Sequence, residues 1–336
     1  MASVDPISRE SALGLREIVQ LVEDDLARVE ALFDEQIRSD VRLVSEVGRY
    51  IREGGGKRVR PALLLLASRL CGFRGERAVV LAGTVEFIHS ATLLHDDIID
   101  EATVRRGRRS VNSRWGNDVT VLLGDFLYTK SMAMALSQDN LRILRLLSDV
   151  TLRMIEGEIL EIEGNGNMQT TEDEHIDVIR RKTADLFSAC TRIGAILGDV
   201  GAEEEEALAL YGLNLGICFQ MVDDLLDFTA EEKTLGKPVA NDLREGKVTL
   251  PMIFLLQRAG AAGAGKVRAV LEDRGFSRVS REEIVRLARE HGALEEARAL
   301  AGRFADEARK ALFVFGPSPY RDALLALPGF VLARDH

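Results

Sequence analysis

The chain has 336 residues, of which 46% are hydrophobic and 29% are charged, and its formal net charge is −10. The apolar fraction is large enough for an extensive core and excludes an intrinsically disordered chain. An acidic chain without a dominant basic stretch is a poor candidate for nucleic-acid binding, because lysine and arginine must replace the counterions of phosphates. Its three scattered cysteines, Cys71, Cys190 and Cys218, match no metal-binding spacing and are expected to be small core residues.

Helical periodicity extends along most of the chain, whereas the alternating apolar runs typical of strands are essentially missing. Long helices are expected at about residues 9–37, 41–53, 60–71, 76–100, 118–136, 140–163, 172–198, 203–226, 280–291 and 293–315. Short glycine-rich breaks are expected at residues 54–56, 164–166, 236–238 and 260–265. Because no linker or repeat interrupts this pattern, we expect an all-α fold with a single domain over residues 1–336.

Two features bear on the location of the protein. Residues 1–40 carry acidic side chains throughout and lack the apolar core of a signal peptide. Apolar runs also stay shorter than the ~18 residues that would suggest a membrane span. These features predict a cytoplasmic globular protein without a transmembrane segment.

Two aspartate-rich motifs share the pattern DDxxD: Asp96-Asp97-Ile98-Ile99-Asp100 and Asp223-Asp224-Leu225-Leu226-Asp227. With 24 aspartates in the chain, chance placement would give about 0.1 such motif, so a plain surface acidic face explains the pair poorly. At about 100° per residue, one helix face collects His89, Asp96 and Asp100, and another helix face collects Gln220, Asp223 and Asp227. His95 points about 100° away from Asp96 and is expected to be a packed or capping residue.

Both motifs lie in strongly apolar surroundings, where crowded carboxylates repel each other and lose hydration. A bound cation would offset both costs. Oxygen ligands without thiolates indicate a hard cation, and Mg²⁺ is commonly held by one or two carboxylates plus substrate phosphates. The sequence therefore predicts Mg²⁺ at the two motifs.

Basic residues that could anchor phosphate accompany the acidic motifs. They occur in the glycine-rich segment 54–61, at Arg105-Arg106 after the first motif, and at Lys237 and Lys247, which bracket Asp242 after the second. Each group alone is better explained by solvated surface side chains. Together with two carboxylate motifs, however, they indicate a site for diphosphates.

Three segments carry a resemblance to a known family: GGGKRVRP, HSATLLHDDIIDEATVRRG and FQMVDDLLDFTAEEKTLGKPVANDLREGK. Over about residues 54–247 the chain resembles the trans-isoprenyl diphosphate synthases, or polyprenyl synthetases, and is closest in pattern to long-chain octaprenyl and decaprenyl diphosphate synthases. The resemblance implies an all-α fold of antiparallel helices around a central cavity, usually in a homodimer. It also implies a prenyltransferase that condenses isopentenyl diphosphate with an allylic diphosphate, head to tail.

The resemblance further implies roles for individual residues. The principal Mg²⁺ ligands would be Asp96, Asp100 and Asp223, supported directly or through water by Asp97, Asp224 and Asp227, with Asp227 counted among the metal ligands. The allylic diphosphate would be held by Arg105, Lys182, Thr183, Gln220 and Lys237, and isopentenyl diphosphate by Lys57, Arg60, His89 and Arg106. Lys247 and Asp242 would close the second acidic side. With the aspartates, Lys182 and Lys237 would act on the leaving diphosphate, so no protein nucleophile is needed.

Product length is expected to depend on the helix of the first motif. Ala91 and Thr92 are small, whereas short-chain relatives carry a bulky aromatic near these positions, so a product of roughly eight to ten isoprene units, such as a quinone side-chain precursor, is expected by resemblance. Thr84, Ile88 and Ala91 are candidates for the tunnel wall, although packing against a neighbouring helix explains each equally well. Met132 and Met134 are candidates for its floor.

Several alternatives remain open from the sequence. A shorter-chain synthase making a C15–C20 product would use the same motifs. A non-catalytic partner subunit would typically have eroded aspartate motifs, and both are intact here. A class I terpene cyclase would need neither the second DDxxD motif nor a second diphosphate site. A purely structural helical bundle would have no reason to place six aspartates in apolar settings.

Overall fold

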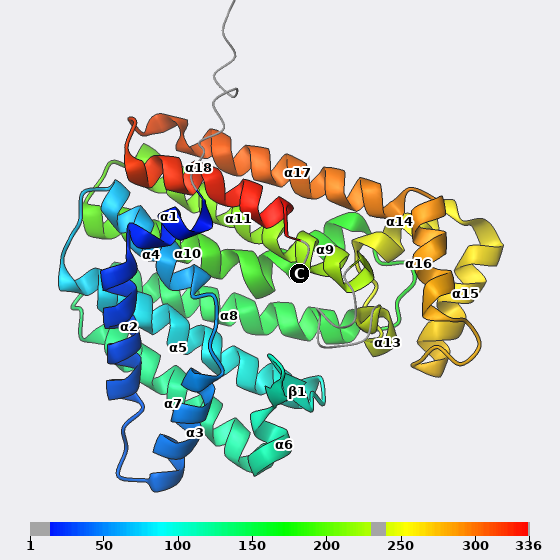
Figure 1. Cartoon of the computed structure of the whole chain (residues 1–336), viewed down its shortest axis with the longest axis horizontal. Coiled ribbons are helices and arrows are strands. Elements are labelled where there is room, and N and C mark those ends of the chain that lie inside the picture. The colour runs from blue at the N-terminus through cyan, green and yellow to red at the C-terminus, as the bar shows by residue number, and fades with distance from the viewer. Residues whose placement is uncertain (1–13, 230–239, 335–336) are drawn as a thin grey trace, which may run out of the picture.

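The computed structural model describes residues 14–229 and 240–334, which are almost entirely helical (Figure 1). The first half contains α1 (Leu15–Gln20), α2 (Glu23–Gln36), α3 (Arg42–Glu53), α4 (Val59–Leu70), α5 (Glu76–Ile99), α6 (Val111–Trp115), α7 (Asn117–Leu136) and α8 (Leu141–Gly164). The second half contains α9 (Glu172–Ile179), the π-helical segment η2 (Arg180–Ala184), α10 (Asp185–Gly198), α11 (Ala202–Thr229), α13 (Asn241–Glu245), α14 (Leu250–Arg258), α15 (Gly260–Asp273), α16 (Arg281–Glu290), α17 (Ala293–Ala311), the 3-10 turn η3 (Leu312–Val314) and α18 (Pro319–Leu332).

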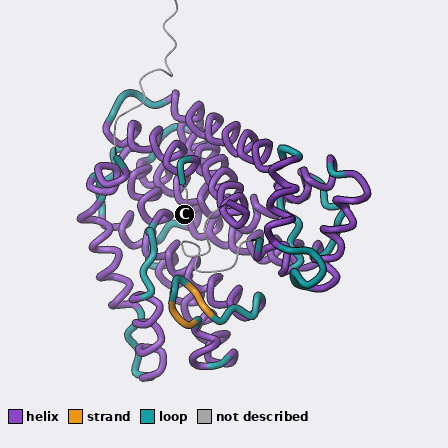
Figure 2. Tube along the Cα trace, turned by 45° about the vertical axis from the view of Figure 1, so that its right-hand side comes forward, coloured by secondary structure: helices purple, strands orange, loops and turns teal. Residues whose placement is uncertain are grey.

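Strand structure among the described residues is limited to one short hairpin, drawn in orange in Figure 2. Strand β1 (Val104–Arg105) pairs antiparallel with β2 (Arg108–Arg109), so that Arg105 lies opposite Arg108. The hairpin directly follows the end of α5. The predicted all-α class is therefore confirmed.

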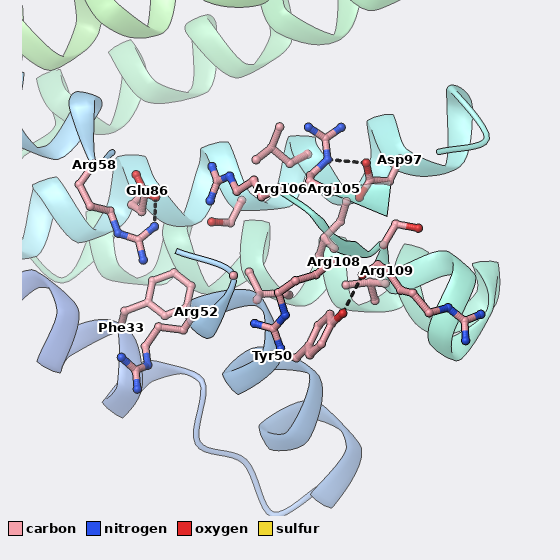
Figure 3. Close-up of a pocket in the computed structure, with 17 residues that line it drawn as sticks. Phe33, Tyr50, Arg52, Arg58, Glu86, Asp97, Arg105, Arg106, Arg108 and Arg109 are labelled. Carbon is pink, nitrogen blue, oxygen red and sulfur yellow. Dashed lines mark hydrogen bonds and ion pairs between the residues drawn. The ribbon is translucent and has the colours of Figure 1, made fainter. Parts of the chain in front are cut away.

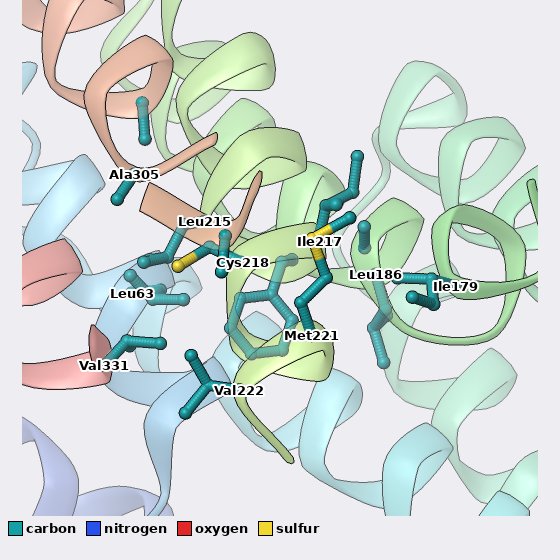
Figure 4. Packing of buried hydrophobic residues seen from close by; sticks show 14 of the residues in the cluster. Leu63, Ile179, Leu186, Leu215, Ile217, Cys218, Met221, Val222, Ala305 and Val331 are labelled. Atoms are coloured by element: carbon teal, nitrogen blue, oxygen red, sulfur yellow. The ribbon is translucent and has the colours of Figure 1, made fainter. Parts of the chain in front are cut away.

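The long helices pack into a bundle in which α5 lies against α4 and α7, and α11 lies against α10 and α17. Its main core contains buried residues from α1 through α18. Within that core, Leu215, Cys218 and Val222 on one side of α11 approach Leu63 of α4 and Val331 of α18 (Figure 4). Because residues from both ends of the chain share this core, the bundle gives a rigid support to the ends of α5 and α11, which carry the two aspartate motifs. The expectation of a single domain stays a prediction.

Three predicted elements differ from the observed ones. The helix expected at 9–37 is interrupted after Gln20, so that α1 and α2 are separate over the part described. The helix expected at 172–198 contains the π-helical segment η2. Residues 260–265, expected to be a break, are the start of α15; the chain turns only at Gly260, whose φ is +61°, and the later residues are held helical by the burial of Val267 and Val270. Helices α6, α13, α14, α15 and α18 were not predicted.

Helix α8 approaches segment η2 closely at Gly157. A Cβ on Gly157 of α8 would meet the Cβ of Arg181 at 2.7 Å and the backbone nitrogen of Lys182 at 3.0 Å. Glycine at this position therefore lets the two backbones come together. A π turn changes the register of a helix by one residue and often occurs at functional sites. Here it carries Lys182 and Thr183, two of the predicted substrate-binding residues.

Two helices are long and apolar enough to cross a membrane by length and composition alone, contrary to the expectation from the sequence. In α5, 72% of the apolar window is buried inside the protein, as for a core helix. In α7 the buried share is 39%, because part of its apolar face is exposed. These two helices do not establish a membrane span.

Candidate active site

A cavity of about 810 Å³ lies between the loop before α4, the C-terminal halves of α5 and α11, helices α8 and α9, segment η2 and the end of the chain. Its size is within the range of small-molecule sites. Predicted site residues that line it are Lys57, Arg60, His89, Thr92, Asp96, Arg105, Arg106, Lys182, Thr183, Gln220, Asp223, Asp224, Asp227, Asp242 and Lys247. Lys237 lies outside the described residues. The structure thus brings together almost all the residues that the sequence singled out.

The first aspartate motif ends α5, where the partial negative charge of the helix C-terminus favours a cation. Asp96 faces the cavity, and burial together with the charge of Glu158 raises the pKa of its carboxyl to about 7. Asp100, the C-cap residue, accepts a hydrogen bond from Lys247 Nζ at 3.1 Å. Asp97 is buried instead and accepts a 2.5 Å hydrogen bond from Arg105 Nε. Asp96 and Asp100 are therefore placed for a metal, whereas Asp97 orients Arg105.

The second motif lies near the C-terminus of α11 and shows the same division of roles. Asp223 is half exposed and lines the cavity, with the guanidinium of Arg334 3.7 Å away. Asp224 is buried and accepts hydrogen bonds from Gln220 at 3.0 Å and His175 at 2.9 Å. Asp227 is also buried, and its carboxylate accepts the backbone N–H groups of residues 241 and 242 at 3.2 Å each, at the start of α13.

No ready-made metal site exists among residues 14–229 and 240–334, because no three His, Cys, Asp or Glu side chains converge there on one point. The donors that face the cavity are nevertheless carboxylates, which suit a hard cation. Mg²⁺ keeps several waters and takes its remaining ligands from substrate phosphates, so one or two carboxylates from each motif are enough. Asp96 and Asp223, which line the cavity, fit that requirement, and Asp100 lies beside it, bound to the lining residue Lys247.

Four of the predicted residues form what we call the cation corner: Lys57, Arg60, His89 and Arg106. Lys57 and Arg106 have no ion pair within the described part of the chain. Arg60 lies over the ring of Phe187 at 4.9 Å, and its buried Nε has no hydrogen-bond partner. Burial and the charges of the neighbouring arginines hold the pKa of His89 well below its usual range, so its ring is neutral. Three cations without an ion pair among the described residues, next to a neutral imidazole, are therefore suited to bind an anion.

A contrasting group, the lysine–carboxylate corner, contains Lys182, Lys247, Glu158, Glu161 and Asp100. Lys182 Nζ lies 2.5 Å from Glu161 and 2.7 Å from Glu158. Lys247 Nζ lies 3.1 Å from Asp100, 3.2 Å from Glu245 and 3.6 Å from Glu161. Although burial lowers it, the pKa of Lys182 is raised by Glu161 and Glu158. Both lysines are therefore protonated, and carboxylates of the chain already balance their positive charges.

The hairpin that carries Arg105 and Arg106 is held by Tyr50 of α3 (Figure 3). Tyr50 donates a 2.7 Å hydrogen bond from its hydroxyl to the carbonyl of Arg109. Its ring packs between two guanidinium groups, with Arg108 at 4.2 Å and Arg114 at 4.6 Å from the centroid. These contacts hold the hairpin so that Arg105 and Arg106 reach the cavity.

The residues expected to control product length are placed differently from the prediction. Thr92 lines the cavity, but Thr84, Ile88 and Ala91 are buried and do not. Ala91 packs in a separate core cluster that contains Phe33, Phe87, Leu123 and Met134, and Met132 packs against the main core. Ala91 is thus packed with side chains of α2 and α7, and the assignment of Thr84, Ile88 and Ala91 to the wall of a product tunnel stays a prediction. Apolar lining comes instead from Leu93, Met154, Val178 and Ile179.

His95 behaves as expected of a packed residue. Its Nε2 lies 3.3 Å from the carbonyl of Val121, and its ring lies so close to Gly124 of α7 that a Cβ there would be 2.2 Å away. It does not line the cavity.

Sequence reasoning missed five cavity or near-cavity residues: Glu86, Glu158, Glu161, His175 and Arg334. Glu86 shares the helix face of His89, so the 100° spacing used for the first motif could have found it. Glu158 and Glu161 are three residues apart on a predicted helix, a spacing that solvated faces also have. Nothing local distinguishes Arg334, which reaches Asp223 and the ring of Phe219 only through the packing of α18.

Known proteins share this sequence and architecture. The family model described as polyprenyl synthetase matches residues 41–287. Octaprenyl diphosphate synthase from Escherichia coli K12 is 40% identical over 96% of this chain and 100% of its own. A decaprenyl diphosphate synthase structure from Rhodobacter capsulatus has a TM-score of 0.90 at 40% identity, covering 96% of this chain and 99% of that one. A polyprenyl synthase from Caulobacter crescentus CB15, solved with calcium and isoprenyl diphosphate, has a TM-score of 0.92 at 34% identity, covering 96% and 98%. The chain belongs to the polyprenyl synthetase family.

Proposed function

We propose that this protein condenses isopentenyl diphosphate with an allylic prenyl diphosphate, head to tail, and repeats the reaction to form a long-chain all-trans polyprenyl diphosphate. The observation that carries the proposal is the cavity itself, in which unpaired cations around Arg60 face two carboxylate motifs. One set of charges suits a diphosphate directly, and the other suits a diphosphate bound through metal ions. Similarity to octaprenyl and decaprenyl diphosphate synthases supports the long product.

The two substrates are assigned to the two corners. Lys57, Arg60 and Arg106, with the neutral ring of His89, hold the diphosphate of isopentenyl diphosphate. Lys182, Arg105, Thr183 and Gln220 hold the allylic diphosphate next to Asp96 and Asp223. Thr183 already donates a 3.0 Å hydrogen bond to Gln220, and Gln220 is fixed in turn by Asp224. A role for Lys237 at this site stays a prediction.

The reaction needs stabilisation of charge rather than a nucleophile. Mg²⁺, bound through Asp96, Asp100 and Asp223 and supported by the other motif aspartates, would neutralise the diphosphate as it leaves. Lys182 and Arg105 donate hydrogen bonds to the same leaving group as the allylic C1–O bond breaks. The double bond of isopentenyl diphosphate then attacks C1, and the released diphosphate accepts the proton that C2 of the isopentenyl unit loses as a new double bond forms. Apolar side chains such as Met154 and Ile179 shield the allylic cation from water.

A homodimer is part of the proposal. Apolar side chains on α7 and α8 stay largely exposed, including Leu122, Leu152, Ile155, Ile159 and Ile162. The α8 residues recur every three or four positions and so form one stripe. Exposed apolar patches of this kind mark protein interfaces, and a second copy of this chain offers a matching stripe. Light scattering that detects only monomers would remove this part of the proposal. The cytoplasmic location expected from the sequence stays a prediction.

Product analysis tests the function. Purified protein is incubated with Mg²⁺, farnesyl diphosphate and labelled isopentenyl diphosphate, and the product lengths are resolved. A ladder that ends near eight to ten isoprene units, roughly C40–C50, is expected by analogy with the long-chain relatives. Products that stop at C15 or C20 would keep the enzyme class and reject the long chain length. Absence of incorporation, with a known synthase active in parallel, would favour a non-catalytic partner subunit.

Two variants test which residue borders the growing chain. Thr92→Phe adds a ring to the cavity wall and is expected to shorten the product. Ala91→Phe adds the same ring to a filled core next to Phe33 and Phe87, so it is expected to lower stability by about 1–3 kcal/mol and to leave the product length of the folded fraction unchanged. A shorter product from Ala91→Phe alone would instead support the assignment of Ala91 to the tunnel wall.

A further inference from the structure

Glu86 is a buried carboxylate among the cations of the site, and the family assignment gives it no role. It lies on α5 and is only 4% exposed. It borders both the catalytic cavity and the smaller pocket behind the hairpin (Figure 3). Its Oε1 lies 2.5 Å from Arg58 Nη1. A buried carboxylate in this position must be compensated by cations, and so it also fixes where those cations lie.

Arg58 connects Glu86 to the loop that carries the neighbouring cations. It is the N-cap residue of α4 and has a left-handed conformation, with φ of 46°. Such a conformation costs a non-glycine residue energy and persists only where its surroundings hold it. Glu86 binds one edge of the guanidinium, and Glu30 of α2 binds the other. Because the side chain of Glu30 is 35% exposed and that of Glu86 only 5%, the buried Glu86 is the stronger anchor for the backbone between Lys57 and Arg60.

Glu86 also offsets repulsion between arginines. A Cβ on Gly56 would lie 2.8 Å from Arg106 Nη1 and 3.2 Å from Arg58 Nη1, so both guanidinium groups pack against this glycine. Burial lowers the pKa of Arg60 and of Arg106, and the negative charge of Glu86 opposes the lowering in both. One carboxylate therefore acts on Arg58 and on both arginines of the cation corner.

We propose that Glu86 is a positioning residue for the isopentenyl diphosphate subsite: it holds Arg58, and with it the 54–58 loop, and it keeps Arg60 and Arg106 at the spacing that one diphosphate requires. The inference rests on the proposed function, because it takes isopentenyl diphosphate as the occupant of the cation corner. Glu86 does not contact the substrate, since a carboxylate next to a diphosphate would repel it. Its effect reaches the substrate through the arginines.

The test compares Glu86→Gln with Glu30→Gln, which removes the outer partner of the same Arg58 and leaves the cavity unchanged. Binding of isopentenyl diphosphate to the full-length protein is measured by calorimetry without primer or Mg²⁺. Glu86→Gln is expected to raise Kd, and the KM for isopentenyl diphosphate, about tenfold, because a buried charge pair loses one partner. The KM for the allylic substrate is expected to change less than about twofold, and Glu30→Gln is expected to bind like the wild type.

Each other result has a defined meaning. Unchanged or tighter binding in Glu86→Gln would overturn the proposal, because charge removal alone favours an anion. Equal weakening in both variants would also overturn it, since any anchor of Arg58 would then serve. Failure of the wild type to bind isopentenyl diphosphate would instead reject the substrate assignment of the corner. If Glu86→Gln does not fold, Arg58→Lys, which keeps the charge but cannot bridge both acids, must show the same tenfold loss, and wild-type binding by this variant would refute the idea.

Discussion

The cation corner and the lysine–carboxylate corner lie in one cavity, yet their charges are balanced in opposite ways. Arg60 and Arg106 lack ion pairs within residues 14–229 and 240–334, and the buried Nε of Arg60 has no hydrogen-bond partner. By contrast, Lys182 is paired with two carboxylates and Lys247 with three. The first corner has positive charge available for an anion. In the second corner, carboxylates of the chain already balance the positive charge.

With the proposed assignment of the substrates, this difference would keep two chemically similar diphosphates apart. A diphosphate entering the cation corner gains new charge-assisted hydrogen bonds at once. A diphosphate entering beside Lys182 must compete with Glu158 and Glu161, and it meets Asp96 and Asp223 as repelling charges. Only a cation bound to those aspartates makes the second corner attractive. The cation corner should therefore bind its substrate without metal, and the other should not.

The largest effect is expected from Asp96→Asn, which removes one of the proposed metal-binding carboxylates. We expect kcat to fall about 10³-fold, the scale on which loss of transition-state charge stabilisation acts. Binding of isopentenyl diphosphate should stay within about twofold of the wild type, since the cation corner is intact. Steady-state kinetics and calorimetry on the same preparation measure both. A comparable loss in isopentenyl diphosphate binding would show that the corners are not independent.

A smaller but selective effect is expected from Arg60→Gln. The change removes a buried cation that has no carboxylate partner, so the KM for isopentenyl diphosphate should rise about 30- to 100-fold, with little change for the allylic substrate. Arg49→Gln, on the exposed face of α3, serves as the matched control. Equal losses for both substrates in Arg60→Gln would argue against assigning this corner to one of them.

Glu161→Gln should partly convert the second corner into the first. Glu161 contacts both Lys182 and Lys247, so its neutralisation releases positive charge toward the cavity. We expect metal-free affinity for an allylic diphosphate to rise several-fold, on the scale of about 1 kcal/mol for a partly exposed ion pair. Glu163→Gln, exposed on the same helix, should have no such effect. If metal-free binding does not improve, neutralisation of the lysines is not what blocks the anion.

The smallest effect concerns pH and stability. Burial and Glu158 raise the folded-state pKa of Asp96 from 3.8 to about 7. Between these values the folded chain keeps a proton that the unfolded chain has lost, so this group makes the metal-free protein less stable as pH rises through that window. Between about pH 5 and about pH 8, we expect the Tm of Asp96→Asn to fall less than the Tm of the wild type. Added Mg²⁺ should restore part of the Tm that the wild type loses over this range. Identical pH dependence of the two proteins would contradict the raised pKa.

Much of this site could be predicted because its residues repeat at helical spacing along two segments. The 100° rule placed His89 and Asp96 on one face of α5, and both line the cavity. The same rule could not decide between the inward and the packed side of a small residue such as Ala91, which is buried in the core cluster that contains Phe33 and Phe87. Which neighbour fills the space beside an alanine depends on helices that are distant in the sequence.

Other features depend on long-range packing from the start. The π-helical segment that presents Lys182 is accompanied by the close approach of α8 at Gly157, which no pattern within residues 172–198 reveals. Arg334 reaches Asp223 only because α18 packs beside α4 and α11. The acids at 158 and 161 also have the spacing of a solvated face, and only the fold directs them at two lysines.

The most direct test of the account is a calorimetric titration of the metal-free protein with each substrate in turn, using an unreactive thio analogue of the allylic diphosphate, followed by repetition with Mg²⁺. The account predicts that isopentenyl diphosphate binds with nearly the same affinity in both conditions, whereas the allylic analogue binds only when Mg²⁺ is present. Metal-free binding of the allylic analogue, or a strict Mg²⁺ requirement for isopentenyl diphosphate, would contradict it.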